Sequence, residues 1–290
     1  MRYKLSAPAT LHTTIQLPAS KSISNRALIL HALAQGHIAP SNLSDCDDTR
    51  VMIKALDGNP GHIDILAAGT AMRFLTAYLS VTPGTRIITG TERMQQRPIR
   101  ILVDALRELG AQIEYAGKEG FPPLRITGTE LTGEEISLAG NVSSQYISAL
   151  LMIGPILKNG LRLNLTGEII SRPYINLTLQ LMKEFGADAA WSSESSITVR
   201  PGKYRDIPFT VESDWSGASY WYQMVALIQD NEKKESTKTE IKLPGLLPHS
   251  YQGDSRGAEI FAKLGVHTTY TDQGVVLTKM GTPVTCLKED

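Results

Sequence analysis

Basic and hydroxyl residues stand at the start of an apolar segment near the N-terminus. The stretch LPASKSISNRALIL contains Lys21, Ser22 and Arg26 within a span of six residues. The segment from Asn25 to Ala34 is predicted to form a buried helix. Ser22 and Arg26 are four residues apart, so a helix that has begun by then places them on one face. An ammonium, a hydroxyl and a guanidinium fork together can hold a phosphate. The spacing also allows a capped helix with two solvated cations.

Two kinds of anion-binding group precede other predicted helices. In AAGTAMR, Gly69 would let a ligand approach the backbone closely, although a tight turn without a ligand explains the glycine as well. In ERMQQRP, Pro98 suits the first helical position and places Arg97 at the helix start, where a cation opposes the helix dipole unless an anion binds. ISRPY repeats this pattern with Arg172 before Pro173, and a solvated loop is the alternative explanation.

Hydroxyl, amide and carboxyl side chains precede two further apolar helices. VSSQY contains Ser143, Ser144 and Gln145, which can bind sugar-like hydroxyls or phosphate oxygens. Capping explains one serine but less readily the whole triplet. VESDWS contains Glu212 and Asp214, which are possible acids or bases, but a helix cap followed by solvated charge is the explanation we favour.

The sequence has none of the familiar signatures of a metal or nucleotide site. Its six histidines show no HExxH pattern or paired spacing, and there is no P-loop and no dinucleotide fingerprint. We therefore expect no metal site.

Composition restricts the class of protein. The chain has 290 residues, 42% hydrophobic, which is enough for one large or two medium domains. Its net charge of zero disfavours a nucleic-acid or anionic-membrane partner. Cys46 and Cys286 are too few and too far apart to suggest a disulfide framework, so a reducing, cytoplasmic location is expected. The N-terminus has no apolar signal core, and the longest apolar runs, such as Ile147 to Leu157, are too short to span a bilayer.

The elements that must position these groups follow a repeat. Three helical segments, LVDALRELGA, LTLQLMKEFGA and AEIFAKLGV, end at Gly110, Gly186 and Gly265, which are 76 (186 − 110) and 79 (265 − 186) residues apart. Each is preceded by another helix and a short β-like run, and each is followed by two strand-like runs. The unit is therefore strand, helix, strand, helix, strand, strand. An earlier copy begins with SNRALILHALA, and its second half, near Gly58 to Asp64, is predicted to be shortened, which gives about four units.

The first helix of each unit begins with Ser, Thr or Gly, so free backbone N–H groups and a positive dipole end lie at its start. Units packed around a pseudo-symmetry axis could aim several such ends at one anion site. Ordinary capping remains the alternative for any single helix.

Taken together, seven motifs in order resemble the series of the 5-enolpyruvylshikimate-3-phosphate synthase family. They run from about Leu17 to Gly265 and are LPASKSISNRAL, AAGTAMR, ERMQQRP, SSQ, SRPYINLTLQLMKEFGA, VESDWSGASY and YQGDSRGAE. The resemblance implies an α/β (α+β) fold of the inside-out α/β barrel type, with two pseudo-symmetric domains built from βαβαββ units. It places a complete three-unit domain at residues 20–211 and a partial second domain at residues 1–19 plus 212–290.

The resemblance also implies an activity in the shikimate pathway. The family transfers the enolpyruvyl group of phosphoenolpyruvate to the 5-hydroxyl of shikimate 3-phosphate, releases phosphate and needs no cofactor. By motif match, Lys21 is the catalytic residue and contacts both substrates, and Gln145 is expected near both. Gly69 and Arg97 resemble phosphoenolpyruvate ligands. The residues that resemble shikimate-3-phosphate ligands are Ser22, Arg26, Ser143, Ser144, Gln145 and Ser171.

The chain departs from the family pattern in two places. Ala67 stands where the family commonly has an asparagine before Ala-Gly-Thr. The family has six units, so the chain is expected to lack the C-terminal third, and the main acid/base aspartate and glutamate are expected beyond Asp290. We therefore do not assign Glu212 and Asp214 to those roles. A monomer is expected.

Two other functions are weighed against this one. The sister family, UDP-N-acetylglucosamine enolpyruvyl transferase, usually has Lys-Asn where this chain has Lys21-Ser22, and it usually carries a reactive loop cysteine; no cysteine lies between Cys46 and Cys286 here. A non-catalytic phosphometabolite-binding fragment would keep the helix starts and lack the acid/base half.

Overall fold

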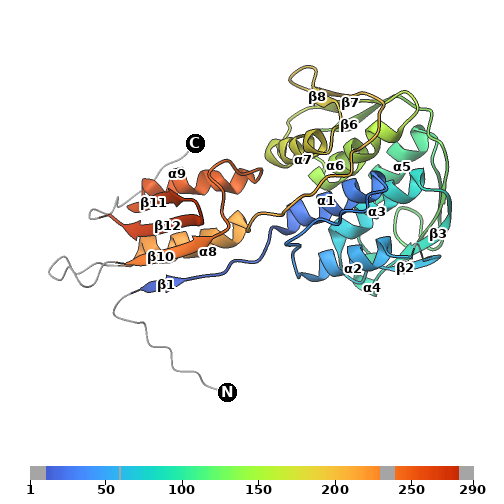
Figure 1. The fold of residues 1–290 in the computed structure, drawn as a ribbon. Helices are drawn as coiled ribbons and strands as arrows, with labels where there is room; N and C mark the ends of the chain where they lie inside the picture. Colours follow the sequence, from blue (N-terminus) through green and yellow to red (C-terminus); the bar gives the residue numbers. More distant parts are fainter. Residues whose placement is uncertain (1–10, 59, 229–238, 281–290) are drawn as a thin grey trace. The chain divides into compact units, whose positions relative to one another are not determined.

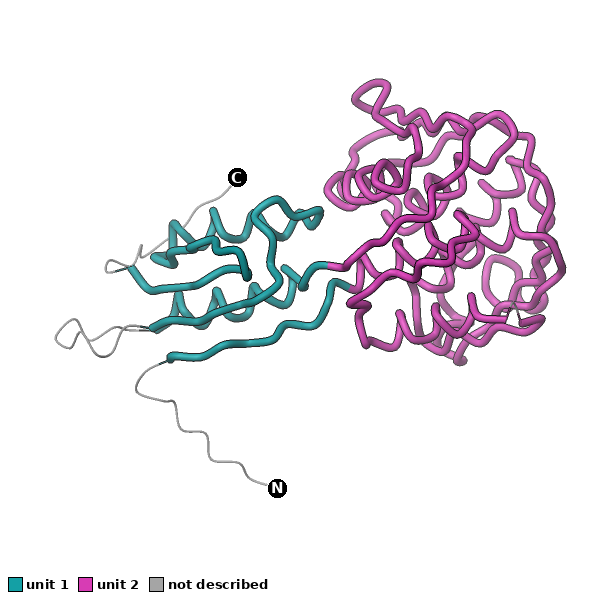
Figure 2. The backbone as a smooth tube through the Cα atoms, in the orientation of Figure 1, with its two compact units in different colours: residues 1–20, 212–290 teal, residues 21–211 magenta. Residues whose placement is uncertain are grey.

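The chain divides into two compact units, coloured separately in Figure 2. The structure, a computed structural model, describes residues 11–58, 60–228 and 239–280. Unit 1 comprises Met1–Ser20 and Glu212–Asp290, and unit 2 comprises Lys21–Val211. The two connecting segments run antiparallel beside each other, with Ser20 N donating to Glu212 O at 2.9 Å.

One arrangement of four strands occurs three times in the described residues (Figure 1). The sheet orders are β2-β3-β5-β4, β6-β7-β9-β8 and β1-β10-β12-β11. In each sheet the first two strands pair in parallel and the other pairs are antiparallel. Each parallel pair is joined through a helix, as a parallel connection requires. In unit 1, the whole of unit 2 is inserted between β1 and the helix that follows it.

The elements have these bounds. Unit 2 contains α1 (Lys21–Leu33), α2 (Asp47–Leu56), β2 (His62–Asp64), α3 (Gly69–Val81), β3 (Gly84–Thr89), α4 (Glu92–Gln95), α5 (Arg100–Glu108), β4 (Gln112–Tyr115), β5 (Leu124–Gly128), β6 (Glu135–Ala139), α6 (Ser144–Ile153), η1 (Gly154–Ile156), β7 (Leu161–Thr166), α7 (Arg172–Glu184), β8 (Ala189–Trp191) and β9 (Ser196–Val199). Unit 1 contains β1 (His12–Thr14), α8 (Trp215–Leu227), β10 (Glu240–Pro244), η3 (Gly253–Arg256), α9 (Gly257–Ala262), β11 (Val266–Thr271) and β12 (Gly274–Lys279).

The predicted helix ends are confirmed, and the hydrogen bonds give the reason. Gly110 follows α5 with φ 105°, its N–H donates to Arg107 O, and Ala111 N donates to Leu106 O. Gly186 follows α7 in the same way. This is the Schellman arrangement, in which glycine takes the left-handed conformation at low cost. Gly265 also has a positive φ of 78°, but it lies two residues after the C-cap of α9.

One boundary of the predicted repeat is wrong. Residues Gly58 to Asp64 were assigned to the shortened end of the opening copy, but His62–Asp64 forms β2 and pairs in parallel with Ile87–Thr89 of β3. These residues therefore begin the next unit. The opening copy itself consists of α1 and α2 with an isolated parallel bridge between Ser41 and Thr210.

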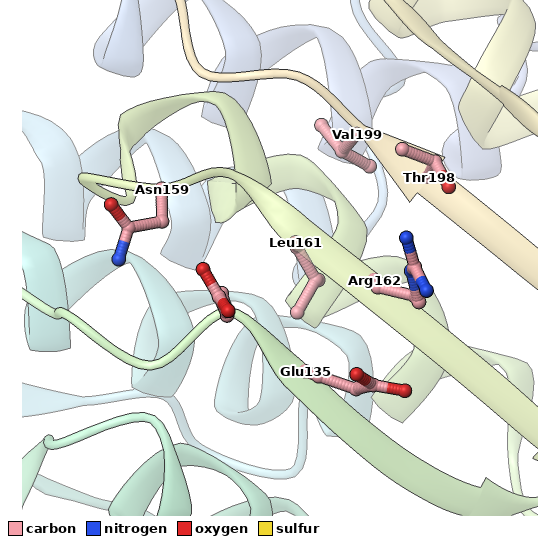
Figure 3. Close-up of a pocket in the computed structure, with 7 residues that line it drawn as sticks. Glu135, Asn159, Leu161, Arg162, Thr198 and Val199 are labelled. Carbon is pink, nitrogen blue, oxygen red and sulfur yellow. The ribbon is translucent and has the colours of Figure 1, made fainter.

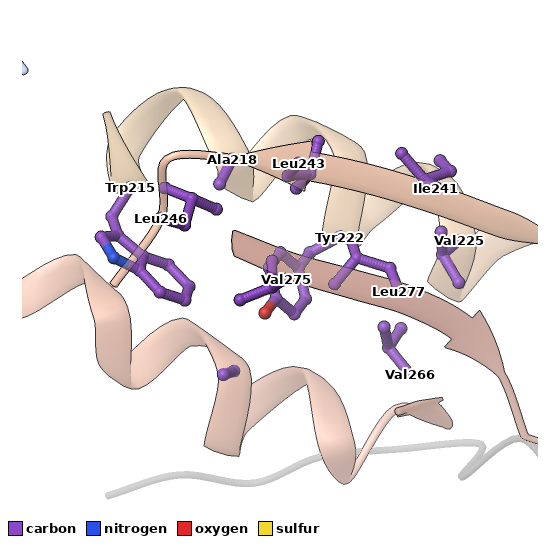
Figure 4. Close-up of a cluster of buried hydrophobic side chains, with 11 residues drawn as sticks. Trp215, Ala218, Tyr222, Val225, Ile241, Leu243, Leu246, Val266, Val275 and Leu277 are labelled. Atoms are coloured by element: carbon purple, nitrogen blue, oxygen red, sulfur yellow. The ribbon is translucent and has the colours of Figure 1, made fainter. Parts of the chain in front are cut away.

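Burial differs between equivalent helices. In α3, eleven of thirteen residues are buried, and α6 is buried from Tyr146 to Ile153. In α8, only Trp215, Ala218, Tyr222 and Val225 are buried. They pack with residues of β10, β11 and β12 in the core of unit 1 (Figure 4). None of the helices in the described ranges is long and apolar enough to cross a membrane.

Candidate functional site

Most of the residues predicted to bind substrate lie at the starts of four helices in unit 2. Figure 1 shows α1, α3, α6 and α7 in this unit, where α3 packs on α1 and α6, and α7 packs on α1 and α6. We call Lys21, Ser22, Gly69, Arg97, Ser143, Ser144, Gln145 and Ser171 the helix-start site. The helix α1 begins at Lys21, so Lys21 and Ser22 belong to its first turn, and its buried part begins at Ile23, two residues before the predicted Asn25.

Arg26 of α1 forms hydrogen bonds that link α1 with α6 and α7. Its Nε donates to Thr178 Oγ1 of α7 at 2.7 Å, its Nη2 donates to Ser148 Oγ of α6 at 2.9 Å, and its Nη1 donates to Ser22 O at 2.9 Å. Arg26, Ser148 and Thr178 lie one to two turns after the starts of α1, α6 and α7, so the three starts lie within about 10 Å of this cluster.

The burial of Arg26 was not foreseen. Its side chain is 3% exposed, its guanidinium lies 5.2 Å from the centre of the Phe74 ring, and desolvation lowers its pKa to about 10. Three of its five N–H groups are used within the protein, which leaves at most two for a ligand. Its hydrogen bonds therefore fix α1, α6 and α7 relative to one another.

Gly69 and Arg97 lie in contact. A Cβ on Gly69 would be 2.5 Å from Arg97 Nη1 and 2.9 Å from Nη2, so the guanidinium occupies the space that a side chain at this position would need. Gly69 is the first residue of α3, and Arg97 is exposed between α4 and α5. The structure therefore brings together both residues predicted to bind phosphoenolpyruvate alone. Pro98 does not open α5, because the first residue of that helix is Arg100.

The first turns of α3 and α6 are joined by a side-chain hydrogen bond. Gln145 Nε2 donates to Thr70 Oγ1 at 3.2 Å. Ser143 is the N-cap of α6, and its hydroxyl accepts from Gln145 N at 3.3 Å. Capping thus explains Ser143, whereas Ser144 and Gln145 are the first two residues of the helix.

The first turn of α2 connects α1 with α3. Thr49 Oγ1 donates to Asn25 Oδ1 of α1 at 2.8 Å, and Asp48 Oδ1 accepts from Thr70 N at 3.3 Å. Asp48 and Thr70 were not singled out from the sequence, because each acts through a neighbour distant along the chain. The contact of Asp48 with the N-terminal end of α3 places a carboxylate where the helix dipole favours one.

Ser171 and Arg172 differ in their surroundings. Ser171 is the N-cap of α7, and its side chain makes no capping hydrogen bond. Arg172 donates from Nη2 to Glu194 O at 2.6 Å and lies over the Trp191 ring at 4.2 Å. Arg172 is therefore bound to the β8–β9 hairpin, and the expected equivalence between Arg97 and Arg172 is wrong.

The helix-start site suits an anion. Lys21 and Arg97 are exposed cations, and neither forms an ion pair with another described residue. The unpaired N–H groups and dipole ends of the helices add positive potential to that of the two cations. Among the described residues, no group of three or more His, Cys, Asp or Glu side chains could hold a metal ion. Cys46 is a free thiol, and Cys286 lies outside the described residues.

A separate hollow lies at the starts of β6 and β7, in the repeat that contains β6, β7, β8 and β9 (Figure 3). Its volume is about 260 Å³, and its lining includes Glu134, Glu135 and Arg162 at the starts of β6 and β7. The strand starts are opposite to the end at which β6 leads into α6. Glu135 already accepts a hydrogen bond from Asn164 Nδ2 at 2.8 Å. The two carboxylates make this hollow unsuitable for a phosphate ester.

Comparison with known proteins identifies the family. The family model described as EPSP synthase (3-phosphoshikimate 1-carboxyvinyltransferase) matches residues 5–58 and 59–289. A 3-phosphoshikimate 1-carboxyvinyltransferase of Bacteroides fragilis is 71% identical over 290 residues, which is all of this chain and 69% of that protein. The enzyme of the same name from Shewanella halifaxensis is 38% identical over 91% of this chain and 66% of its own length.

A solved structure agrees in fold. The EPSP synthase from Acinetobacter baumannii has a TM-score of 0.76 at 20% identity, over 94% of this chain and 66% of that one. The chain thus spans about two thirds of the length of the proteins it matches. The chain belongs to the EPSP synthase family, the 3-phosphoshikimate 1-carboxyvinyltransferases.

Proposed function

We propose that the chain takes part in transferring the enolpyruvyl group of phosphoenolpyruvate to the 5-hydroxyl of shikimate 3-phosphate, with release of phosphate. The observation that supports this most directly is the contact of Arg97 with Gly69 beside the Gln145–Thr70 hydrogen bond. It gathers an exposed guanidinium, an amide and the first turn of α3 in one place. Both substrates are phosphate esters, and such groups bind phosphate oxygens.

The substrates are assigned to different parts of the helix-start site and to the neighbouring Arg26. Shikimate 3-phosphate binds to the starts of α1, α6 and α7, and phosphoenolpyruvate binds to the start of α3. Lys21 and Gln145 contact both substrates, and Gly69 and Arg97 contact phosphoenolpyruvate. The residues assigned to shikimate 3-phosphate alone are Ser22, Arg26, Ser143, Ser144 and Ser171.

The reaction needs both cations and proton transfer. The 5-oxygen attacks the phosphate-bearing carbon of phosphoenolpyruvate, the methylene carbon gains a proton and the hydroxyl loses one. The tetrahedral intermediate then expels phosphate, and its methyl group loses a proton to restore the double bond. Lys21 and Arg97 stabilise the anionic phosphate and carboxylate through these steps. We assign the proton transfers to no described residue, including Glu212 and Asp214. A cytoplasmic location and a monomeric state remain predictions from the sequence.

Calorimetry and phosphate release together test this function. The 290-residue chain is titrated with shikimate 3-phosphate, then with phosphoenolpyruvate on the saturated complex. We expect both to bind, and Lys21→Ala to weaken both. Phosphate release that needs both substrates would show that this chain also performs the transfer. Binding without release would favour the fragment that binds phosphometabolites without catalysis. A folded chain that binds neither substrate would contradict the proposal.

A further inference from the structure

A second buried arginine lies directly beneath the contact between Gly69 and Arg97. Arg73, the fifth residue of α3, is 5% exposed and forms no ion pair with another described residue. Desolvation is the main cause that lowers its pKa, and the charge of Arg97 lowers it further. A buried cation without an acidic partner costs free energy that an apolar side chain would not. The position therefore needs an explanation in terms of what the guanidinium contacts.

Arg73 bonds to the two backbone positions that surround Arg97. Its Nη1 donates to Gly69 O at 3.0 Å, and its Nη2 donates to Pro98 O at 3.3 Å. Gly69 is the residue on which the Arg97 guanidinium rests, and Pro98 is the residue that follows Arg97. The planar guanidinium of Arg73 thus links the backbone of Gly69, which Arg97 contacts, to the backbone of Pro98, which follows Arg97. The shorter, single-nitrogen head of lysine cannot reproduce a planar fork.

Tyr146 supports the same carbonyl from the neighbouring helix. Its hydroxyl donates to Pro98 O at 2.9 Å, and its ring centre lies 5.8 Å from the Arg73 guanidinium. Arg97 N donates to Met94 O at 3.0 Å, so the backbone is held on both sides of Arg97. Tyr146 directly follows Gln145. The helix α6 therefore contacts both the first turn of α3, through Gln145, and the segment that carries Arg97, through Tyr146.

We infer that Arg73, with Tyr146, is a positioning residue that holds Arg97 over Gly69 in the orientation that binds the anionic groups of phosphoenolpyruvate. This inference rests on the function proposed above. The described contacts of Arg73 are two backbone carbonyls, the Met94 sulfur at 4.0 Å and the Tyr146 ring, so it acts through Arg97. Binding phosphoenolpyruvate then requires little reordering of Arg97, because its backbone is already fixed.

The test combines binding with hydrogen exchange. In the full chain saturated with shikimate 3-phosphate, Arg73→Gln should raise the Kd for phosphoenolpyruvate about tenfold, as expected for losing hydrogen bonds from a charged group. Tyr146→Phe should raise it about threefold, since it removes one neutral hydrogen bond. Affinity for shikimate 3-phosphate should stay within about twofold in both variants, because neither side chain has a described hydrogen bond to a residue assigned to that substrate. Deuterium uptake of the segment 92–98 in the free chain should increase.

A double-mutant cycle separates positioning from a direct or a general structural role. In an Arg97→Ala background, Arg73→Gln should change the Kd for phosphoenolpyruvate by less than about twofold, since the two residues act as one. Arg86→Gln is the matched control, because Arg86 is also buried and bonds to the Thr82, Pro83 and Gly84 carbonyls at the other end of α3. It should reduce stability without changing uptake in 92–98 or affinity for phosphoenolpyruvate. Arg73→Lys should behave like Arg73→Gln in reduced degree.

The remaining outcomes test either the positioning role of Arg73 and Tyr146 or the proposed function. An additive cycle, or unchanged uptake in 92–98 for both Arg73→Gln and Tyr146→Phe, would overturn the positioning role. If Arg73→Gln fails to fold, Tyr146→Phe decides alone, because it retains the ring. If the unmodified chain binds no phosphoenolpyruvate, the proposed function fails, and the exchange data still decide whether Arg73 and Tyr146 hold the segment that carries Arg97.

Discussion

The Arg26 guanidinium on α1 donates to the Ser148 hydroxyl on α6 at 2.9 Å. The same hydroxyl lies 2.9 Å from Thr178 Oγ1 on α7, which also accepts from Arg26 Nε. All three side chains are buried. Three helices that carry parts of the helix-start site are therefore joined by one polar cluster rather than by apolar packing alone. Such clusters are costly to break, because each buried polar group needs its partner.

Ser148→Ala should destabilise the protein. The change leaves Arg26 Nη2 without this acceptor in a buried place, which costs about 1–3 kcal/mol, as expected for a buried donor that loses its partner. Urea unfolding followed by circular dichroism measures the cost. Ser80→Ala is the control, because the Ser80 hydroxyl is buried in α3 but donates only to Thr76 O of its own helix at 2.8 Å. Equal losses for the two variants would show that the Arg26 contact has no special weight.

Gly69→Ala should reduce affinity for phosphoenolpyruvate and leave the fold intact. The new methyl would lie 2.5 Å from Arg97 Nη1, the far end of a flexible side chain, so Arg97 moves rather than the backbone. We expect the Kd for phosphoenolpyruvate to rise about three- to tenfold and stability to change by less than about 1 kcal/mol, because alanine favours helix.

A second glycine provides the control for that substitution. A Cβ on Gly217 of α8 would have its nearest contact at 3.7 Å, an ordinary van der Waals distance. Gly217→Ala should therefore leave phosphoenolpyruvate binding unchanged. Calorimetry on both variants makes the comparison. Unchanged affinity in Gly69→Ala would mean that the position of Arg97 does not matter for this ligand.

The sequence predicts most of the repeat because its signals are local. A glycine after an amphipathic helix and two alternating runs can be recognised within about twenty residues. The start of the second repeat was missed because β2 has only three residues, too few for a periodic pattern. Its identity as a strand depends on pairing with β3, which is a contact between distant segments.

The site shows the same division between residue types and contacts. The motifs identify Gly69, Arg97 and Gln145 as candidates, but not that Gln145 bonds to a residue 75 positions away. Arg26 is a candidate from the motifs as well, but they do not show that it bonds to hydroxyls 122 and 152 positions away. Its buried place could not be read from SNRALIL, because the partners that make the burial tolerable lie on other helices.

Lys21→Ala should weaken the binding of both substrates without affecting the stability of the fold. Lys21 is exposed on the first turn of α1 and takes part in no ion pair with another described residue. Removing it should raise each Kd about tenfold or more, since a charged hydrogen bond to an anion is lost. Lys158→Ala is the control: that exposed side chain lies 3.9 Å from Glu130, on the opposite side of the repeat from α6's start. A loss confined to one substrate would show that Lys21 does not contact both.

Glu212 occupies a buried polar network in unit 1. Its Oε1 accepts from Ser250 Oγ at 2.6 Å and from Gln252 Nε2 at 3.0 Å, and Gln252 also donates to Ser213 O. Burial is the largest cause that raises the pKa of Glu212 above its ordinary value of 4.5, and these hydrogen bonds partly oppose it. The folded state therefore favours the protonated carboxyl. Its contribution to stability is fully present below 4.5 and is lost as pH rises through the raised pKa.

Glu212→Gln should consequently gain stability relative to the unmodified chain as pH rises, because glutamine does not ionise. The difference in stability between the two should be smallest below pH 4.5, the ordinary value for this carboxyl, and largest at neutral pH. Thermal unfolding in a Trp191→Phe background measures it, since the remaining tryptophans, Trp215 and Trp221, report on unit 1. Glu259→Gln, which removes an exposed carboxyl on α9, is the control for the loss of one carboxylate from unit 1. A difference for Glu212→Gln that is constant across this range would show that the hydrogen bonds from Ser250 and Gln252 balance the effect of burial on the pKa, and a difference that shrinks as pH rises would show that they outweigh it.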